Sequence, residues 1–550
     1  MKEAKPYIIC GVVVILLLCL KLNTWSASFG SIEEFRGATL QEDIFYPLIA
    51  KSINKDKRLS IKVDGQDVPN QFDEIHIGRD KKVLLSLDFL RDKMDLCAFY
   101  KDDDTALIIY NGKENKVELI TEDNIDYVRA DKVCDITGFS CDANMESYEV
   151  SINTNSNKSV LPAKFDLRDY ARVAPAMNQG NATTCWAFAS ILALESGVMP
   201  RKADYDVEAM IEFNGEKTGD NAGGAFTNAL AYLLSWSGPI NANSGSVRLS
   251  GNDVDEVKHV QETKFYTHND INDIKWAVYK YGGVSTSIFA NVSNTNLNKS
   301  SYYNLSTNSY CYDGESEPNH EITIIGFDDN YSASNFGVPV RGDGAFICQN
   351  SWGKDFGDSG VFYVSYYDKN IGSQAVSYSR IMEPSYYDKI YQSDLCGWKG
   401  QLGYGQSNAL AANVYTAKSG EMLRAVGLYA IDKNTSVTVS LVRNYDGTGS
   451  LKEREQVASR TFNEAGFYTI ELDHPVELQS GEKFAIVIDI RVPGSVRPVA
   501  MEYKVDDNDT SVNVKDGEGY ISKDGINWES VEEKANGNLC LKAYTTDVEE

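Results

Sequence analysis

The feature that most constrains this chain is a cysteine at the start of an apolar stretch. A glutamine precedes it, and a histidine and an asparagine follow far downstream in the sequence. Cys185 lies six positions after Gln179 and opens the stretch that runs to Pro200. His320 follows the cysteine by 135 residues, and Asn350 follows it by 165 residues. A fold that brings these four side chains together contains the parts of a site for acyl transfer by a thiol.

The sequence predicts that Cys185 lies at the N-terminus of an α-helix. Thr183 and Thr184 are suitable capping residues. Apolar residues then recur near helical spacing, and Gly197 and Pro200 are expected to end the helix. This position matters because only the thiolate is a good nucleophile, and the N–H groups and dipole of a helix N-terminus lower the pKa of a thiol.

The other three residues complete the predicted chemistry. We expect His320 to exchange a proton with the thiol and then to protonate the leaving amine. Asn350 would hold the imidazole ring in place, while the Gln179 amide and the Cys185 N–H would stabilise the developing oxyanion. Taken alone, Cys185 has the alternative of being an inert buried thiol. The presence of the other three residues in this order argues against that alternative.

These residues resemble the papain family of cysteine peptidases over roughly residues 161–382, within a domain expected at 159–382. The match begins at Leu161-Pro-Ala-Lys-Phe-Asp-Leu-Arg-Asp169, and further anchors are Asn319-His320 and Asn350-Ser-Trp-Gly353. The resemblance implies an α+β domain made of a helical half and a β-barrel-like half, with the site in the cleft between them.

The resemblance also implies roles for residues beside the site. Gly223 and Gly224 would bind the backbone of a substrate, and Trp352 would shield the pair formed by the histidine and the asparagine from water. Trp186 is expected next to the nucleophile as a second shielding residue. Without the resemblance, the glycine pair would be a turn and the two tryptophans would be core aromatics.

Three residues depart from the pattern of the family, and two of them lie where the family binds substrate side chains. Ala182 replaces one half of a disulfide that is common in the family, and Thr183 replaces a glycine next to the first substrate pocket. Glu321 falls where the family lines the pocket for the second residue before the cleaved bond. A carboxylate there would favour arginine or lysine in the substrate; the alternative is that Glu321 turns to solvent or pairs with a base. The extra length at Asp328–Gly344 is expected to be an inserted hairpin.

The N-terminus is predicted to be an export segment. Residues 1–28 contain lysines followed by an apolar run at 7–20, which is the pattern of a signal peptide or a signal anchor. The body of the chain is therefore expected to be extracellular or at the cell surface. Membrane contact is expected only through residues 7–20, and only if the segment is uncleaved.

Residues 30–155 contain a weak internal repeat at an offset of 43 residues. Each half is predicted to form a strand, a short helix and two further strands. The region resembles the copper amine oxidase N-terminal-like, or stalk, domains of exported bacterial proteins. The alternative is an unrelated α+β pro-region. A separate hypothesis is that the chain is a zymogen whose N-terminal region restrains the site until it is cleaved within the exposed stretch Asn153–Ala163.

Residues 386–547 are expected to form an all-β sandwich. Short β-rich segments are separated by turns rich in glycine, asparagine and aspartate, and they lie at Ser436–Arg443, Phe467–Leu472, Phe484–Ile490 and Leu539–Tyr544. The region resembles the lectin-like domain that follows papain-type domains in bacterial proteins. Contact with a glycan or a cell wall is a hypothesis that this resemblance in shape does not by itself establish.

Composition argues against several other classes of protein. The net charge of −26 and the pI near 4.7 disfavour a nucleic-acid partner. The ten cysteines show no framework spacing, so a disulfide-rich fold is not indicated. Because there are five histidines and neither a Cys-x-x-Cys pair nor a His-Glu-x-x-His motif, no metal or other cofactor is predicted.

The sequence therefore predicts a multidomain, exported thiol peptidase that hydrolyses a peptide or protein substrate. One alternative is a non-catalytic cell-surface adhesin or glycan-binding protein on a peptidase scaffold, which the intact set of four site residues disfavours. A wall-peptide amidase shares the cysteine–histidine chemistry, but the Asn-Ser-Trp-Gly sequence does not support it.

Overall fold

The computed structural model describes most of the chain from residue 59 onward. The predicted export segment at 1–28 and the start of the N-terminal region lie outside the described residues. Within the described part, no helix combines the length and apolar character needed to cross a membrane. The described residues are 59–155, 158–201, 203–215, 223–242, 258–267, 270–291, 300–505, 511–514 and 517–548.

The N-terminal region contains the order strand, helix, strand, strand twice. The first copy consists of β4 (Val83–Ser86), α3 (Leu87–Lys93), β5 (Cys97–Tyr100) and β6 (Thr105–Tyr110). The second consists of β9 (Ile125–Arg129), α4 (Ala130–Thr137), β10 (Ser140–Asn144) and β11 (Glu149–Asn153). The other strands are β1 (Ser60–Val63), β2 (Gln66–Val68), β3 (Ile75–Ile77), β7 (Lys113–Glu118) and β8 (Ile120–Glu122). The resemblance to stalk domains stays a prediction.

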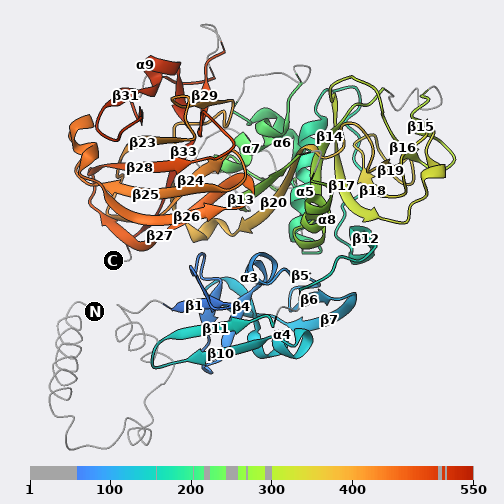
Figure 1. The fold of residues 1–550 in the computed structure, drawn as a ribbon, viewed down its shortest axis with the longest axis horizontal. Helices are drawn as coiled ribbons and strands as arrows, with labels where there is room; N and C mark the ends of the chain where they lie inside the picture. The colour runs from blue at the N-terminus through green and yellow to red at the C-terminus, as the bar shows by residue number, and fades with distance from the viewer. Residues whose placement is uncertain are drawn as a thin grey trace, which may run out of the picture. The chain divides into compact units, whose positions relative to one another are not determined.

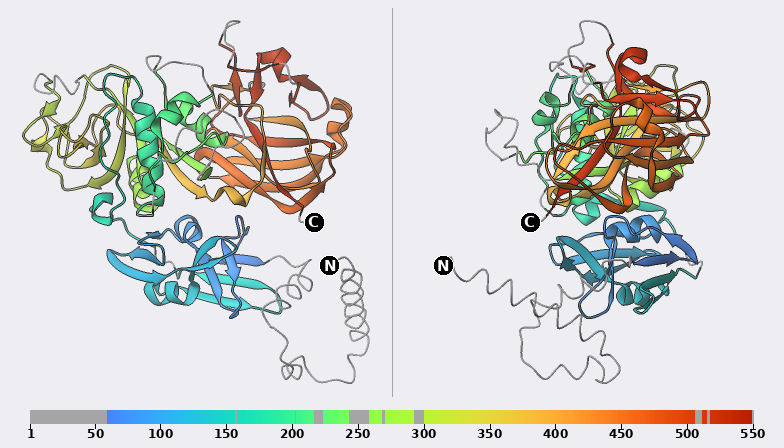
Figure 2. Two further views of the ribbon diagram at one scale, coloured as in Figure 1. Left: turned by 180° about the vertical axis from the view of Figure 1, so that it is seen from behind. Right: turned by 90° about the vertical axis from the view of Figure 1, so that its left-hand side faces the viewer.

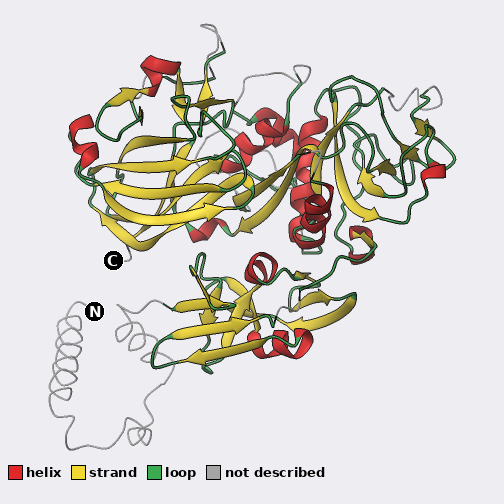
Figure 3. Ribbon diagram, viewed as in Figure 1, coloured by secondary structure: helices red, strands yellow, loops and turns green. Residues whose placement is uncertain are grey.

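The first half of the peptidase region carries most of the longer helices (Figure 3). The central one, α5 (Cys185–Val198), is buried from Trp186 to Ser196, and α6 (Val207–Glu212) and α7 (Phe226–Leu234) pack against it. The helix ends at Val198, shortly before Pro200, as predicted, but Gly197 lies inside its last turn. At Gly197 an added Cβ would be 2.9 Å from the side chain of Ile381, so the missing side chain permits a close approach.

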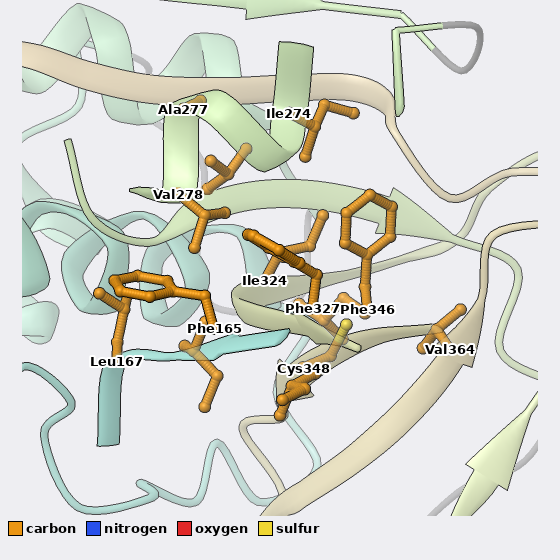
Figure 4. Packing of buried hydrophobic residues seen from close by; sticks show 14 of the residues in the cluster. Phe165, Leu167, Ile274, Ala277, Val278, Ile324, Phe327, Phe346, Cys348 and Val364 are labelled. Carbon is orange, nitrogen blue, oxygen red and sulfur yellow. The ribbon is translucent and has the colours of Figure 1, made fainter. Parts of the chain in front are cut away.

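The second half of the peptidase region is built around antiparallel strands. Helix α8 (Ile271–Lys280) packs on them, and Figure 4 shows its side chains Ile274 and Val278 beside the strand residues Ile324 and Phe346 in one apolar core. This core fixes the strand that begins at His320. The neighbouring strands are β14 (Val284–Ile288), β17 (His320–Asp328), β18 (Ala345–Gln349), β19 (Val361–Ser365) and β20 (Ser373–Met382), and the short strands β12 (Lys164–Asp166), β15 (Tyr303–Asn304) and β16 (Ser309–Tyr310) extend the sheet.

The prediction of an inserted hairpin at Asp328–Gly344 is wrong. The segment between β17 and β18 contains a single turn of 3-10 helix, at Ala333–Asn335, and no strand. Its backbone is held by hydrogen bonds instead, from the Gly344 N–H to the Tyr331 carbonyl at 2.8 Å and from the Ala333 N–H to Asp343 at 2.7 Å. The segment is therefore a long connection between two paired strands.

The C-terminal region consists of two packed sheets, as expected for a sandwich. Their inner faces share one apolar core, to which Val439 and Ile486 contribute from one sheet and Val426 and Ile470 from the other. The first sheet contains β23 (Asn408–Thr416), β25 (Thr435–Val442), β26 (Glu455–Phe462), β28 (Lys483–Arg491), β30 (Gly519–Ser522) and β31 (Trp528–Ser530). The second contains β21 (Lys389–Tyr391), β24 (Glu421–Ala430), β27 (Ala465–Leu478) and β33 (Leu541–Asp547). A small third sheet contains β22 (Gly400–Leu402), β29 (Val499–Tyr503) and β32 (Gly537–Leu539), and helix α9 (Val531–Ala535) precedes β32.

One continuous sheet connects the peptidase region to the sandwich. Strand β13 (His259–Tyr266) pairs with β20 along one edge and with β27 along the other, so that Thr263 lies opposite both Tyr378 and Phe467. The strand order is β15-β16-β19-β18-β17-β14-β20-β13-β27-β24-β33-β21. The ribbon views show these strands running from the peptidase region into the orange and red C-terminal region (Figures 1 and 2). Backbone hydrogen bonds therefore hold the two regions together.

The described N-terminal region is attached to the peptidase region by buried ion pairs. Arg380 of β20, which is 3% exposed, lies 2.6 Å from Glu74, 3.3 Å from Asp88 and 3.2 Å from Asp92. Lys264 of β13 forms a further pair with Asp92 at 3.1 Å. Because removing one partner of a buried pair leaves an uncompensated charge, these contacts make separation of the two regions costly.

Candidate active site

The predicted nucleophile is the first residue of α5. Cys185 is half-buried, and Thr184 before it is the N-cap residue. The predicted capping by a threonine hydroxyl is wrong, because Thr184 has φ −111° and ψ 16° and makes no side-chain capping hydrogen bond. The Thr183 hydroxyl accepts a hydrogen bond from the Gly223 N–H at 3.0 Å instead. This hydrogen bond joins the loop before α5 to the loop that contains the glycine pair.

Opposing effects act on the pKa of the thiol. Burial raises the pKa of Cys185 above the ordinary 9.0, and the backbone N–H groups of Glu321, Trp186 and Cys185 itself oppose that rise. The Glu321 N–H lies 3.5 Å from the sulfur. Because Glu321 is the second residue of β17, this contact places the start of α5 against the start of the strand that carries His320.

His320 is held from two sides. Its Nε2 lies 2.8 Å from Oδ1 of Asn350, and the indole of Trp352 stacks on the imidazole with 4.8 Å between the ring centroids and 28° between the planes. The same Asn350 oxygen accepts the Ser351 N–H at 2.8 Å, which orients the amide. Since an oxygen faces Nε2, that nitrogen carries the proton and Nδ1 of the neutral ring is the basic nitrogen. Burial lowers the pKa of His320, and the hydrogen bond with Asn350 opposes this.

The Gln179 side chain is fixed between two loops. Its Nε2 donates to the carbonyl of Ala182 at 2.7 Å, and its Oε1 accepts from the Ser351 hydroxyl at 2.5 Å. Its backbone N–H donates to the Ser351 carbonyl at 2.9 Å. No role for Ser351 is predicted from the sequence, although it lies inside the Asn-Ser-Trp-Gly stretch. In the structure its hydroxyl holds the Gln179 amide, and its N–H holds the Asn350 amide.

The glycine pair before α7 requires glycine for two different reasons. Gly223 has φ +75°, in the left-handed region that favours glycine. At Gly224, an added Cβ would lie 2.3 Å from Nε1 of Trp186. Trp186 is 2% exposed and belongs to the apolar core behind the pair. The indole of Trp186 therefore supports this loop, whereas Trp352 covers the imidazole.

The two alternatives for Glu321, solvent exposure or pairing with a base, are both wrong. Its side chain is 7% exposed and accepts the N–H of Phe226, the first residue of α7, at 3.1 Å. Its other oxygen is buried and has no hydrogen-bond partner among the described residues. Burial raises the pKa of this carboxyl to about 8; the Cys185 thiol adds to the rise, and the Phe226 N–H opposes it. The group is therefore neutral at pH 7, so it does not repel a thiolate beside it.

No cofactor site emerges from the side chains that the structure describes. Within those ranges, no group of three or more His, Cys, Asp or Glu residues is arranged to hold a metal ion. None of the eight cysteines in the same ranges forms a disulfide, and five of them are buried in the core: Cys97, Cys311, Cys348, Cys396 and Cys540.

Comparison with known proteins identifies both large regions. Residues 161–380 match the family described as "Papain family cysteine protease", and residues 390–545 match the one described as "Lectin like domain". Fruit bromelain of Ananas comosus is 25% identical over 290 residues, which cover 49% of this chain and 74% of that protein. Cysteine proteinase 1 of Entamoeba histolytica is 28% identical over 210 residues, which cover 36% of this chain and 62% of that protein.

Solved structures agree at the level of the fold. A structure of the clostridial cysteine protease Cwp84 after propeptide cleavage has a TM-score of 0.60 and 22% identity, covering 70% of this chain and 99% of that one. The crystal structure of the cysteine protease and lectin-like domains of Cwp84, a surface layer associated protein of Clostridium difficile, gives the same score and identity and is covered to 89%. The chain is therefore a multidomain cysteine-type peptidase, with a papain-family peptidase domain followed by a lectin-like domain.

Proposed function

We propose that this enzyme hydrolyses peptide bonds with Cys185 as the nucleophile. In this proposal His320 is the general base and then the general acid, Asn350 positions the imidazole, and Gln179 donates to the oxyanion. The hydrogen bond between His320 and Asn350, under the Trp352 indole and next to the start of α5, is the observation that carries the proposal. It leaves Nδ1 of the imidazole as the nitrogen that is free to act as the base.

The first half of the reaction transfers the acyl group to the enzyme. The sulfur of Cys185 attacks the substrate carbonyl and forms a C–S bond, and the thiol proton passes to Nδ1 of His320. The carbonyl oxygen becomes an oxyanion, which the Cys185 N–H and the second amide N–H of Gln179 stabilise. As the C–N bond breaks, His320 returns the proton to the leaving amine, and a thioester remains.

The second half of the reaction restores the enzyme. A water molecule attacks the thioester carbonyl and gives one proton to the same nitrogen of His320. The C–S bond then breaks, the product leaves as a carboxylic acid, and the sulfur of Cys185 takes the proton back. Burial of both groups favours the neutral thiol and imidazole at rest. The proton transfer therefore accompanies attack in this scheme.

Variants of two residues test the assignment. Wild-type enzyme incubated with a peptide library should give cleavage products in the mass spectrum, whereas Cys185→Ala should give none and His320→Ala nearly none. Circular dichroism should show that both variants keep the native fold. Undiminished hydrolysis by Cys185→Ala would remove this residue from the mechanism.

We also propose that the enzyme acts outside the cell or at its surface. The predicted export segment motivates this, and the description of Cwp84 as a surface layer associated protein supports it. In the same proposal the lectin-like domain is the part that contacts a glycan or wall polymer. Immunoblots of medium, wall and cytosol fractions from the source cells test the location, and a purely cytosolic enzyme would refute it.

A further inference from the structure

A pocket of about 420 Å³ lies where α7 meets the lectin-like domain, apart from the proposed catalytic residues. This volume is within the range of pockets that hold small ligands or substrate side chains. Its lining combines one residue of α7 with residues from two segments of the lectin-like domain. The lining residues are Thr227, Trp398, Lys399, Gly400, Gln401 and Arg497.

The pocket lining is cationic in a strongly acidic protein. The chain has 79 acidic and 53 basic residues, yet the described lining contains a lysine, an arginine and no carboxylate. Arg497 is exposed and makes no salt bridge with any carboxylate of the described ranges. A net charge of −26 repels acidic ligands over the surface as a whole. The two cations offset that repulsion locally.

One wall of the pocket is a firmly supported indole. The Trp398 ring stacks on Phe265, with 5.8 Å between the centroids and 17° between the planes. Tyr429 supports the same indole at 5.6 Å. Trp398 itself is only half-buried, so part of its ring faces the pocket. An apolar face of this kind suits the methylene groups of an acidic side chain.

Direct contacts connect the pocket to the proposed catalytic site. Phe265, which supports Trp398, also contacts Phe226 with 5.9 Å between the ring centroids. The N–H of Phe226 is bound by Glu321, next to His320. Helix α7 starts two positions after Gly224 and Thr227 is its second residue, so the Cα atoms of Gly224 and Thr227 are at most about 11 Å apart. A peptide backbone on that pair would therefore bring a neighbouring side chain to the pocket.

We propose that this pocket binds an acidic side chain of the substrate, on the N-terminal side of the cleaved bond. The inference rests on the proposed peptidase function and adds a specificity that the lectin-like domain supplies. Lys399 and Arg497 would form charge-assisted hydrogen bonds with the carboxylate, and the Gln401 amide would donate a further one. The lectin-like domain thus takes part in substrate selection.

Matched peptides test this proposal in the complete enzyme. Pairs of internally quenched peptides differ only by Glu or Gln at one of the second to fifth positions before the cleaved bond. At one position, kcat/KM should be about 10-fold higher for Glu in dilute buffer, and the ratio should fall as salt is added. In the double variant Lys399→Gln, Arg497→Gln the ratio should fall to about one. Arg491→Gln, which removes an exposed cation on β28, should keep the wild-type ratio.

Two results would overturn the proposal. One is a Glu-to-Gln ratio near one at every position in the wild type, and the other is a ratio that the double variant leaves unchanged. In both cases hydrolysis of the Gln peptides would still support the proposed function. If an oligogalacturonate bound to the wild type but not to the double variant, while the ratio was one, the pocket would be an anionic-sugar site instead. Hydrolysis of no peptide at all would refute the proposed function and this inference together.

Discussion

Replacing Glu321 by glutamine should change how the stability of the enzyme depends on pH. The folded protein keeps the proton of this carboxyl up to about pH 8, whereas the ordinary carboxyl loses it near 4.5. Between these values only the folded state holds the proton, so the stability that this group contributes is fully present below pH 4.5 and falls as pH rises through the window. The slope is ~1.4 kcal/mol per pH unit. The full loss is therefore roughly 5 kcal/mol by pH 8.

The glutamine side chain removes this linkage and keeps the shape of the group. Its oxygen can still accept the Phe226 N–H, which holds the start of α7. Its NH₂ group would replace the carboxyl oxygen that lacks a partner among the described residues, at a cost of about 1–3 kcal/mol that does not vary with pH. The two proteins therefore differ in their free energy of unfolding by a constant part and by a part that varies with pH. Only the part that varies with pH reports the protonation of Glu321.

Urea unfolding from pH 5 to pH 9 measures this slope. Both proteins carry Cys185→Ala so that self-digestion does not distort the transitions. Burial, the largest cause of the raised pKa of Glu321, remains in this background, whereas the smaller effect of the thiol is lost. The free energy of unfolding of Glu321→Gln, relative to its parent, should therefore increase by ~1.4 kcal/mol per pH unit and level off somewhat below pH 8. Other buried carboxyls contribute equally to both proteins and cancel. Glu453→Gln controls for the loss of one exposed negative charge. A difference for Glu321→Gln that does not vary with pH would refute the buried, neutral carboxyl.

Three further predictions concern the site and its attachments. Gln179→Ala should lower kcat by about 10²–10³ in steady-state assays; an unchanged kcat would remove the amide from the oxyanion site. Gly224→Ala should lower stability by about 1–3 kcal/mol, since the new Cβ collides with Trp186. Gly420→Ala, where an added Cβ meets nothing within 4 Å, should not lower the melting temperature in the same way. Protease nicking within residues 158–163 should leave residues 59–155 bound during gel filtration, because Arg380 remains paired with Glu74; release of that fragment would contradict this.

Local sequence predicted the central helix of the site well and its capping poorly. The start of α5 at Cys185 follows from the apolar run after it. The type of cap depends on the backbone angles of the N-cap residue, which the local sequence does not determine. Thr184 is not extended, so its hydroxyl cannot cap, and Thr183 bonds instead to a loop 40 residues away.

The continuity of the sheet could not be predicted from the sequence. The pairing of Thr263 with Phe467 joins residues that are 204 positions apart, and no turn between them sets the register. Each strand looks locally like an ordinary edge or central strand. Two regions that the sequence describes as separate domains therefore share a sheet.

The orientation of Glu321 was also beyond the sequence. Its position after His320 identified it as a residue of interest, but whether a carboxylate at that position meets substrate, solvent or another element depends on tertiary packing. Here α7 begins against β17, and the N–H of its first residue, which has no acceptor within the helix, provides the partner.

The N-terminal region contacts the peptidase through Arg380 and Lys264, and none of these ion pairs involves Cys185 or His320. These ion pairs therefore do not support the hypothesis that the described part of the N-terminal region directly restrains the catalytic site.

Alkylation of the native enzyme tests directly whether Cys185 is the nucleophile. Iodoacetamide is added in limiting amounts, residual peptide hydrolysis is measured, and the modified cysteine is located by peptide mass spectrometry. Cys97, Cys348 and Cys540 are buried, and burial raises the pKa of each thiol. Activity should be lost in proportion to a single modification at Cys185, and His320→Ala should slow this modification. Complete modification of Cys185 with full activity, or inactivation by modification of another cysteine, would contradict this prediction.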